Sequence, residues 1–502
     1  MLRMVRTENG WVEGLPAADP RITSFKGIPY AAPPTGENRW RAPQPARNWA
    51  GTLQAFRFAP IAMQHRPGED PEIIYTREWN VDPDIPMSED CLHLNIWTPA
   101  RTGDDKLPVL IWFFGGALVE GNTAEMEFDG ERIARRGIVV VTVNYRLNIF
   151  GFFCHPEITA ESPDAPANFG HLDQQFAMRW VHRNIFSFGG DPDNVTLGGQ
   201  SAGGSCVMNQ ITCSKNKGLF RRAIVDSGLI NTPYPDGFFA PGFTLEQSEP
   251  EGVKFLDWLG VSSVAEARKI DAVTLRDKML EYGHFWNPVM DGRFCKGPAL
   301  ESLMDGSVPA VPLLLGHTAD EFPNTPQVQS VQEFQDYAKR VFGEDADEFL
   351  KICASPTGSL SEMKYRATLN HVEYSIRLLA RAWAGDSSKP PIYYWLFNPE
   401  IPGWDKPGSF HSSDLWFFWE TLAKCWRPFV GKHYDLARQM CNYWANFIRC
   451  GDPNGRDADG TDMPEWRPFN GENPMRMYFG DSVQEQSAEP GELLRFLLDQ
   501  SR

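Results

Sequence analysis

The sequence predicts an α/β fold in which a central, mostly parallel mixed sheet is flanked by helices. Continuous apolar runs rich in β-branched residues recur along the chain, and such runs indicate strands that are buried on both faces. Segments with helical periodicity lie between these runs, as expected where helices cover both faces of a sheet. The composition is that of a large globular protein, because 42% of the 502 residues are hydrophobic and 13% are aromatic.

The predicted elements follow the chain in a simple order. The first ninety residues are rich in Pro, Gly and Asn, which predicts loops and short strands. Strands are then expected at 91–98, 108–114, 138–143, 195–197, 223–225, 311–315 and 392–397, and helices at 173–183 and 434–450. No repeat or long linker interrupts the chain, so we expect one large domain over 1–502. Within it, 1–90 is the region of loops and short strands, 91–330 is the sheet core, and 331–502 is a helical C-terminal part.

Charge and cysteine content exclude several classes of protein. The chain carries 48 basic and 65 acidic residues, for a formal net charge of −17, so we expect neither nucleic acid nor a membrane as a partner. The opening segment MLRMVRTENGWVEG lacks the apolar run of a signal peptide, and no apolar stretch is long enough to span a bilayer. Nine scattered cysteines without a C-x-x-C pair predict no metal site and a reducing, cytoplasmic location.

A motif in the middle of the chain predicts a nucleophile. Residues 199–203, GQSAG, match the G-x-S-x-G pattern, in which a strained turn between a strand and a helix exposes a serine hydroxyl. The expected strand 195–197 precedes the motif and a helix start rich in small residues follows it. This context predicts Ser201 as the nucleophile; the alternative is a glycine-rich turn with an ordinary serine.

A serine hydroxyl needs a base at neutral pH, and histidine is the side chain suited to that task. In α/β-hydrolases the acid and then the histidine follow the serine along the chain, which leaves five of the ten histidines. Of these, His411 lies in the loop KPGSFHSSD just beyond the expected strand 392–397, where a strand end would present it. We therefore predict His411 as the base, against the alternative of a solvated loop histidine.

Two further groups complete the predicted chemistry. The expected strand 311–315 leads into HTADEF, so that either Asp320 or Glu321 could orient the histidine, and chemistry alone does not choose between them. The loop WFFGGA ends another buried strand, and its amides at Gly116 and Ala117, with that of Ala202, would bind the tetrahedral oxyanion. The alternative for this loop is a simple turn.

The chain resembles type-B carboxylesterases, the cholinesterase-like branch of the α/β-hydrolase fold, over nearly its whole length. The blocks that carry the resemblance are FKGIPYAAPPTGENRW, SEDCLHLNIW and the region from NFGHLDQQF to GGQSAGG. The resemblance implies Ser201 as nucleophile, Glu321 rather than Asp320 as acid, and His411 as base. It also implies a serine esterase that uses no cofactor.

The chain departs from the family pattern in four places. Gln200 replaces the usual Glu before the nucleophile, which removes a negative charge and predicts little preference for cationic choline esters. Ala117 takes the place of a third glycine in the oxyanion loop, and Phe322 replaces the glycine that normally follows the acid. Cys91 lacks the upstream cysteine with which the family forms a disulfide, so we expect a free thiol.

The resulting prediction is a carboxylic ester hydrolase that forms an acyl-enzyme and acts on small, neutral esters. Aromatic residues 416–419, WFFW, follow the predicted base and either line a substrate pocket or belong to the core. The alternatives are a hydroxycinnamoyl or other aryl esterase, a thioesterase or an amidase that uses the same triad. A non-catalytic cholinesterase-like binding protein is the alternative from a different class.

Overall fold

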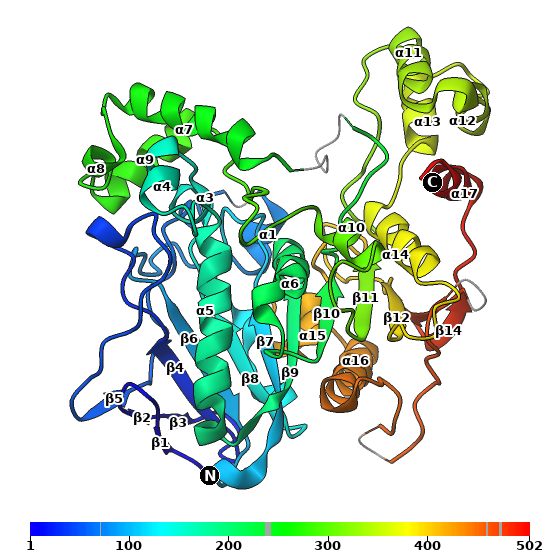
Figure 1. Cartoon of the computed structure of the whole chain (residues 1–502). Coiled ribbons are helices and arrows are strands. Elements are labelled where there is room, and N and C mark those ends of the chain that lie inside the picture. Colours follow the sequence, from blue (N-terminus) through cyan, green and yellow to red (C-terminus); the bar gives the residue numbers. More distant parts are fainter. Residues whose placement is uncertain (71, 236–241, 458–459, 471–473, 502) are drawn as a thin grey trace.

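The computed structural model describes residues 1–70, 72–235, 242–457, 460–470 and 474–501 (Figure 1). Within these residues, the main sheet has 11 strands in the order β14-β13-β12-β11-β10-β9-β7-β8-β6-β4-β3. A small separate sheet has the order β1-β2-β5. The strands are β1 (Met4–Arg6), β2 (Trp11–Glu13), β3 (Leu15–Pro16), β4 (Thr23–Pro29), β5 (Thr52–Gln54), β6 (His93–Thr98), β7 (Leu107–Phe113), β8 (Val139–Val143), β9 (Gly190–Gln200), β10 (Arg222–Asp226), β11 (Leu313–Thr318), β12 (Ile392–Phe397), β13 (Met475–Phe479) and β14 (Val483–Ser487).

The pairing confirms the predicted fold class. From β8 through β7, β9, β10, β11 and β12 to β13, all neighbouring strands are parallel. Antiparallel strands flank this block, with β6, β4 and β3 on one side and β14 on the other. Parallel strands end at the same edge of a sheet, so the loops that follow β7, β9, β11 and β12 open on one edge.

Helices cover both faces of the sheet (Figure 1). They are α1 (Ile74–Glu78), α2 (Glu131–Ala134), α3 (Asn148–Phe152), α4 (Pro156–Glu161), α5 (Phe169–Asn184), α6 (Ala202–Thr212), α7 (Leu245–Leu259), α8 (Val264–Ala267), α9 (Ala272–Tyr282), α10 (Ala299–Met304), α11 (Val331–Phe342), α12 (Ala346–Ile352), α13 (Leu360–Arg366), α14 (His371–Ala382), α15 (Leu415–Phe418), α16 (Gly431–Cys450) and α17 (Glu492–Gln500). Helices α5 and α6 pack on one face of the central strands, and α15 and α16 pack together on the other.

All seven predicted strands and both predicted helices are present. The predicted strand at 195–197 is part of β9, which begins earlier, at Gly190. The first part of β9 reads GDPDN and lacks the β-branched residues that mark a strand, but Gly190 pairs with Leu107 of β7. The tertiary pairing therefore extends this strand beyond what its local sequence predicts.

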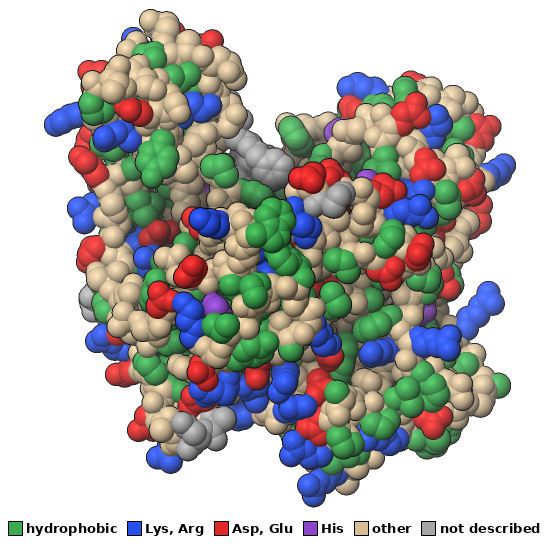
Figure 2. All heavy atoms as spheres, turned by 180° about the vertical axis from the view of Figure 1, so that it is seen from behind, with side chains coloured by type: hydrophobic (Ala, Val, Ile, Leu, Met, Phe, Trp, Pro, Cys, Tyr) green, Lys and Arg blue, Asp and Glu red, His purple; other side chains and the backbone are tan. Residues whose placement is uncertain are grey.

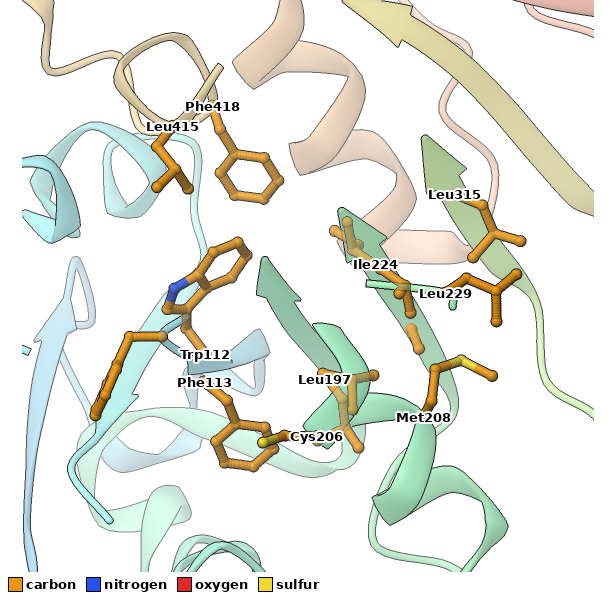
Figure 3. Close-up of a cluster of buried hydrophobic side chains, with 14 of the residues drawn as sticks. Trp112, Phe113, Leu197, Cys206, Met208, Ile224, Leu229, Leu315, Leu415 and Phe418 are labelled. Atoms are coloured by element: carbon orange, nitrogen blue, oxygen red, sulfur yellow. The ribbon is translucent and has the colours of Figure 1, made fainter. Parts of the chain in front are cut away.

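Residues on the central strands form the core between the two helical layers (Figure 3). Trp112 on β7 points toward Phe418 of α15, and their ring centroids lie 4.8 Å apart. The next residue, Phe113, points to the other face, toward Cys206 of α6, as the alternation of a strand requires. The aromatic residues at 416–419 are all 1% exposed or less, so they belong to this core rather than to a substrate pocket.

Two further expectations concern membrane-spanning helices and the cysteines. Among the described residues, no helix is long and apolar enough to cross a membrane. All nine cysteines are free, and Cys91 is buried with its thiol pKa raised by burial. The absence of a disulfide at Cys91 agrees with the prediction made from its missing partner.

Candidate active site

Ser201 occupies a strained turn between β9 and α6. Its backbone has φ 56° and ψ −128°, a conformation that an L-residue rarely adopts and that lifts the side chain out of the strand. The turn requires glycine on both sides, because a Cβ at Gly199 would collide with the carbonyl of Gly203, and one at Gly203 with the carbonyl of Phe113. The amide of Ser201 donates to the carbonyl of Asp226 at the end of β10, at 2.8 Å.

His411 lies in the loop that follows β12 and reaches the serine. Its Nε2 is 2.8 Å from the Oγ of Ser201, although 210 residues separate the two along the chain. The imidazole is largely buried, with 7% of the residue exposed. Asp320 holds this loop in place, because its carboxylate accepts the amide of Ser409 at 2.8 Å while its own amide donates to the Ser409 carbonyl at 3.0 Å.

Glu321 contacts the other side of the histidine. One carboxylate oxygen is 2.5 Å from Nδ1 of His411. The other accepts the hydroxyl of Ser227 at 2.6 Å and the amide and hydroxyl of Thr318, each at 3.1 Å. Burial raises the pKa of Glu321, but the charge of His411 and its hydrogen bond outweigh burial, and the net effect lowers the pKa to about 2. Glu321 is therefore ionised at neutral pH.

The predicted oxyanion loop follows β7 and lies against the serine turn. A Cβ placed on Gly115 would be 3.1 Å from the Cβ of Ser201. The loop turns tightly, since the amides of Val119 and Glu120 both donate to the carbonyl of Gly116, at 3.0 and 3.1 Å. Gly116 has φ 96° and Ala117 has φ 54°, so both lie in the left-handed region that favours glycine.

The three backbone amides predicted to bind the oxyanion have no acceptor among the described residues. Within the described residues, the amides of Gly116, Ala117 and Ala202 donate no hydrogen bond to a protein acceptor. Ala202 is the first residue of α6, where the helix leaves its initial N–H groups unpaired and its dipole favours negative charge. Such amides suit an oxygen that carries a developing negative charge.

Gln200 and Phe322, two of the departures from the family pattern, lie beside the predicted triad and have defined contacts. Gln200 donates its side-chain amide to the hydroxyl of Ser412 at 2.7 Å, and the same nitrogen is 3.4 Å from Nε2 of His411. Phe322 is 44% exposed and its ring centroid lies 4.6 Å from that of His411. The hydroxyl of Tyr75 donates to the carbonyl of His411 at 3.3 Å.

Sequence reasoning missed the groups behind the predicted triad. Ser227 and Thr318 hold Glu321, and both stand directly at the ends of strands, a position that could have marked them. Asp226 and Asp414 form a second layer; both are fully buried, and each affects the pKa of the other. Burial raises the pKa of both carboxyls, that of Asp414 to about 7, and their mutual repulsion raises that of Asp226 further.

Known proteins share this architecture. Residues 2–493 match the model of the carboxylesterase family. The chain belongs to this family. A relative, the fumonisin B1 esterase of Sphingopyxis macrogoltabida, is 31% identical over 506 residues, with 96% of this chain and 87% of that protein covered. The para-nitrobenzyl esterase of Bacillus subtilis (strain 168) is 29% identical over 498 residues, with coverage of 94% and 93%.

A solved structure agrees with the family assignment. The carboxylesterase EST55 of Geobacillus stearothermophilus has a TM-score of 0.74 and 29% identity, and the match covers 99% of this chain and 100% of that one. Together with a cholinesterase of Mus musculus at 28% identity, it places the chain in the type-B, cholinesterase-like branch. The protein is therefore a carboxylesterase-family hydrolase with the α/β-hydrolase fold.

Proposed function

We propose that this carboxylesterase hydrolyses small, neutral esters through an acyl-enzyme formed on Ser201. The observation that carries the proposal is the continuous line of contacts from the Ser201 hydroxyl to His411 at 2.8 Å and from His411 to Glu321 at 2.5 Å. A histidine between a serine and a buried carboxylate is the arrangement that activates a serine hydroxyl.

The steps follow from these contacts. Nε2 of His411 accepts the proton of Ser201 as Oγ attacks the ester carbonyl, and the ionised Glu321 stabilises the resulting imidazolium. The amides of Gly116, Ala117 and Ala202 bind the tetrahedral oxyanion. His411 then protonates the leaving alcohol, and a water molecule attacks the acyl-enzyme in the same way to release the acid.

The surroundings of His411 support neutral substrates. Gln200 places an uncharged amide near Nε2 of His411, where a carboxylate would attract a cation. The half-exposed ring of Phe322 lies against the imidazole and offers an apolar surface beside the reacting atoms. An aryl group on the ester would stack on this ring, so we include aryl esters in the proposed substrate class.

A panel of neutral esters, varied separately in the acyl and alcohol halves, tests this function. We expect turnover of neutral esters by the native protein and none by Ser201→Ala. Failure to hydrolyse any ester, with the variant indistinguishable from the native protein, would favour a non-catalytic binding role.

The nine free cysteines support the predicted reducing compartment, which fractionation of the source cells would test.

A further inference from the structure

A pocket of about 440 Å³ lies between the end of α2 and one side of α16. The carbonyl of Ile448, near the end of α16, accepts from Arg222 at the start of β10, and the carbonyl of Arg449 accepts from Asn194 in the first half of β9. The pocket is therefore at the amino ends of the parallel strands, whereas Ser201 follows the carboxyl end of β9. Its volume falls within the range of small-ligand sites, ~300–1,000 Å³.

Arginines dominate the lining of this pocket. Among the described residues, six arginines and two carboxylates, Glu420 and Asp457, line it; the arginines are Arg132, Arg135, Arg136, Arg438, Arg449 and Arg456. Figure 2 shows basic side chains gathered toward the lower edge of the molecule, on the face behind that of Figure 1. This concentration of arginines contrasts with the net charge of −17 of the whole chain.

Part of the cluster is fixed by internal contacts. Arg136 donates Nε to the Oδ1 of Asn442 at 2.6 Å, and its Nη2 is 2.8 Å from a carboxylate oxygen of Glu420. Only 16% of its side chain is exposed. Arg438 pairs with Asp457. These contacts hold two guanidinium groups in place. In them, each of the two lining carboxylates forms an ion pair with one arginine.

Among the described residues, two other arginines lack a carboxylate partner closer than 3.9 Å. Within the described residues, Arg132 comes within 4.0 Å of a carboxylate only at Glu420, at 3.9 Å, and 45% of its side chain is exposed. Arg449 donates to neutral acceptors, the Oδ1 of Asn446 and the carbonyl of Arg136, each at 3.0 Å. Like charges held together repel, so a bound anion would stabilise this arrangement.

We propose that the pocket binds a phosphate-bearing anion, either free in solution or in a lipid headgroup. Guanidinium groups donate in a planar fork, and a phosphate can accept such forks from several directions because its oxygens are tetrahedral. Arg132 approaches from α2 and Arg449 from α16, so they could share one anion from two sides of the pocket. The side chain of Arg132 is partly exposed, so dissolved salt screens its attraction for the anion. Binding should therefore weaken as ionic strength rises.

Calorimetric titration with inorganic pyrophosphate tests the proposal, and the double variant Arg132→Gln/Arg449→Gln provides the comparison. Gln keeps a hydrogen-bond donor but removes each charge. We expect saturable binding to the native protein and an affinity at least about tenfold lower in the double variant. Arg366→Gln, on the exposed surface of α13, is the matched control and should bind as the native protein does.

A vesicle experiment separates the two sources of phosphate. Vesicles that contain phosphatidic acid would retain the native protein but not the double variant if the ligand is a headgroup, and pure phosphatidylcholine vesicles would retain neither. Pyrophosphate binding without vesicle retention would assign a free anion. The proposal is overturned if neither probe binds, or if both bind the double variant as well as the native protein. Ester hydrolysis should be the same in all these variants, because the pocket lies away from Ser201.

Discussion

Asp320 and Glu321 are neighbours in the chain, yet their carboxylates hold the histidine loop at two different points. Asp320 accepts the backbone amide of Ser409, two residues before the histidine, and Glu321 contacts the imidazole of His411 itself. The first contact fixes the path of the loop and the second fixes the ring. The two acids that sequence chemistry left open as alternatives therefore have separate roles in the structure.

This division predicts unequal effects of removing each charge. Glu321→Gln removes the carboxylate that would stabilise the imidazolium, and kcat/KM should fall by about 10³- to 10⁴-fold. Asp320→Asn keeps an oxygen that can accept the Ser409 amide, so its kcat/KM should fall by less than about tenfold. Steady-state kinetics on one neutral ester compare the two. Equal losses would contradict the assignment of Glu321 as the orienting acid.

The uncharged side chain of Gln200 predicts that the site does not prefer cationic esters over neutral ones. Gln200→Glu should raise the ratio of kcat/KM for a choline ester to that for its neutral isostere by about tenfold, equivalent to about 1.4 kcal/mol of charge interaction. Gln200→Met, similar in size but uncharged, serves as the control and should leave the ratio unchanged. A native protein that already prefers the choline ester would show that Gln200 does not set this preference.

Ala117 predicts a stability effect that is separate from activity. A side chain at φ 54° is strained, so Ala117→Gly should raise the free energy of unfolding by about 0.5–1 kcal/mol. The backbone amide remains, and kcat/KM should stay close to the native value. Lys106→Gly, at φ 50° and outside the predicted site, is the matched control for stability in urea unfolding. A loss of stability in Ala117→Gly would show that the methyl group packs favourably there.

The buried pair Asp226 and Asp414 predicts a pH dependence of stability. Burial raises the pKa of Asp414 from 3.8 to about 7, and the surrounding charges are Asp226, Glu321 and His411. Between these two pKa values the native state holds a proton that the unfolded state releases, so stability falls as pH rises. Asp414→Asn cannot ionise and should lose less thermal stability than the native protein between pH 5 and pH 8. Identical pH profiles would exclude this carboxyl as the source.

Much of the fold was predictable because the residues of most strands are themselves typical of buried β-strands. The runs at 138–143 and 392–397 are apolar and β-branched or aromatic, and both are strands in the structure. The start of β9 was not predictable, since only its pairing with Leu107 makes Gly190 part of a strand. For the candidate site, the motif at 199–203 points to Ser201 from local sequence. Ser227 and Asp414 come near Glu321 only through tertiary packing, which local patterns do not encode.

Covalent labelling with a fluorophosphonate tests whether Ser201 is an activated nucleophile, because this reagent modifies a serine that a neighbouring base activates. Peptide mapping of the native protein should place one adduct on Ser201, and Ser201→Ala should take up none. Glu321→Gln should react far more slowly, since its histidine lacks the ionised partner. A native protein that remains unlabelled, or one labelled at another serine, would contradict the assignment of Ser201 as the nucleophile.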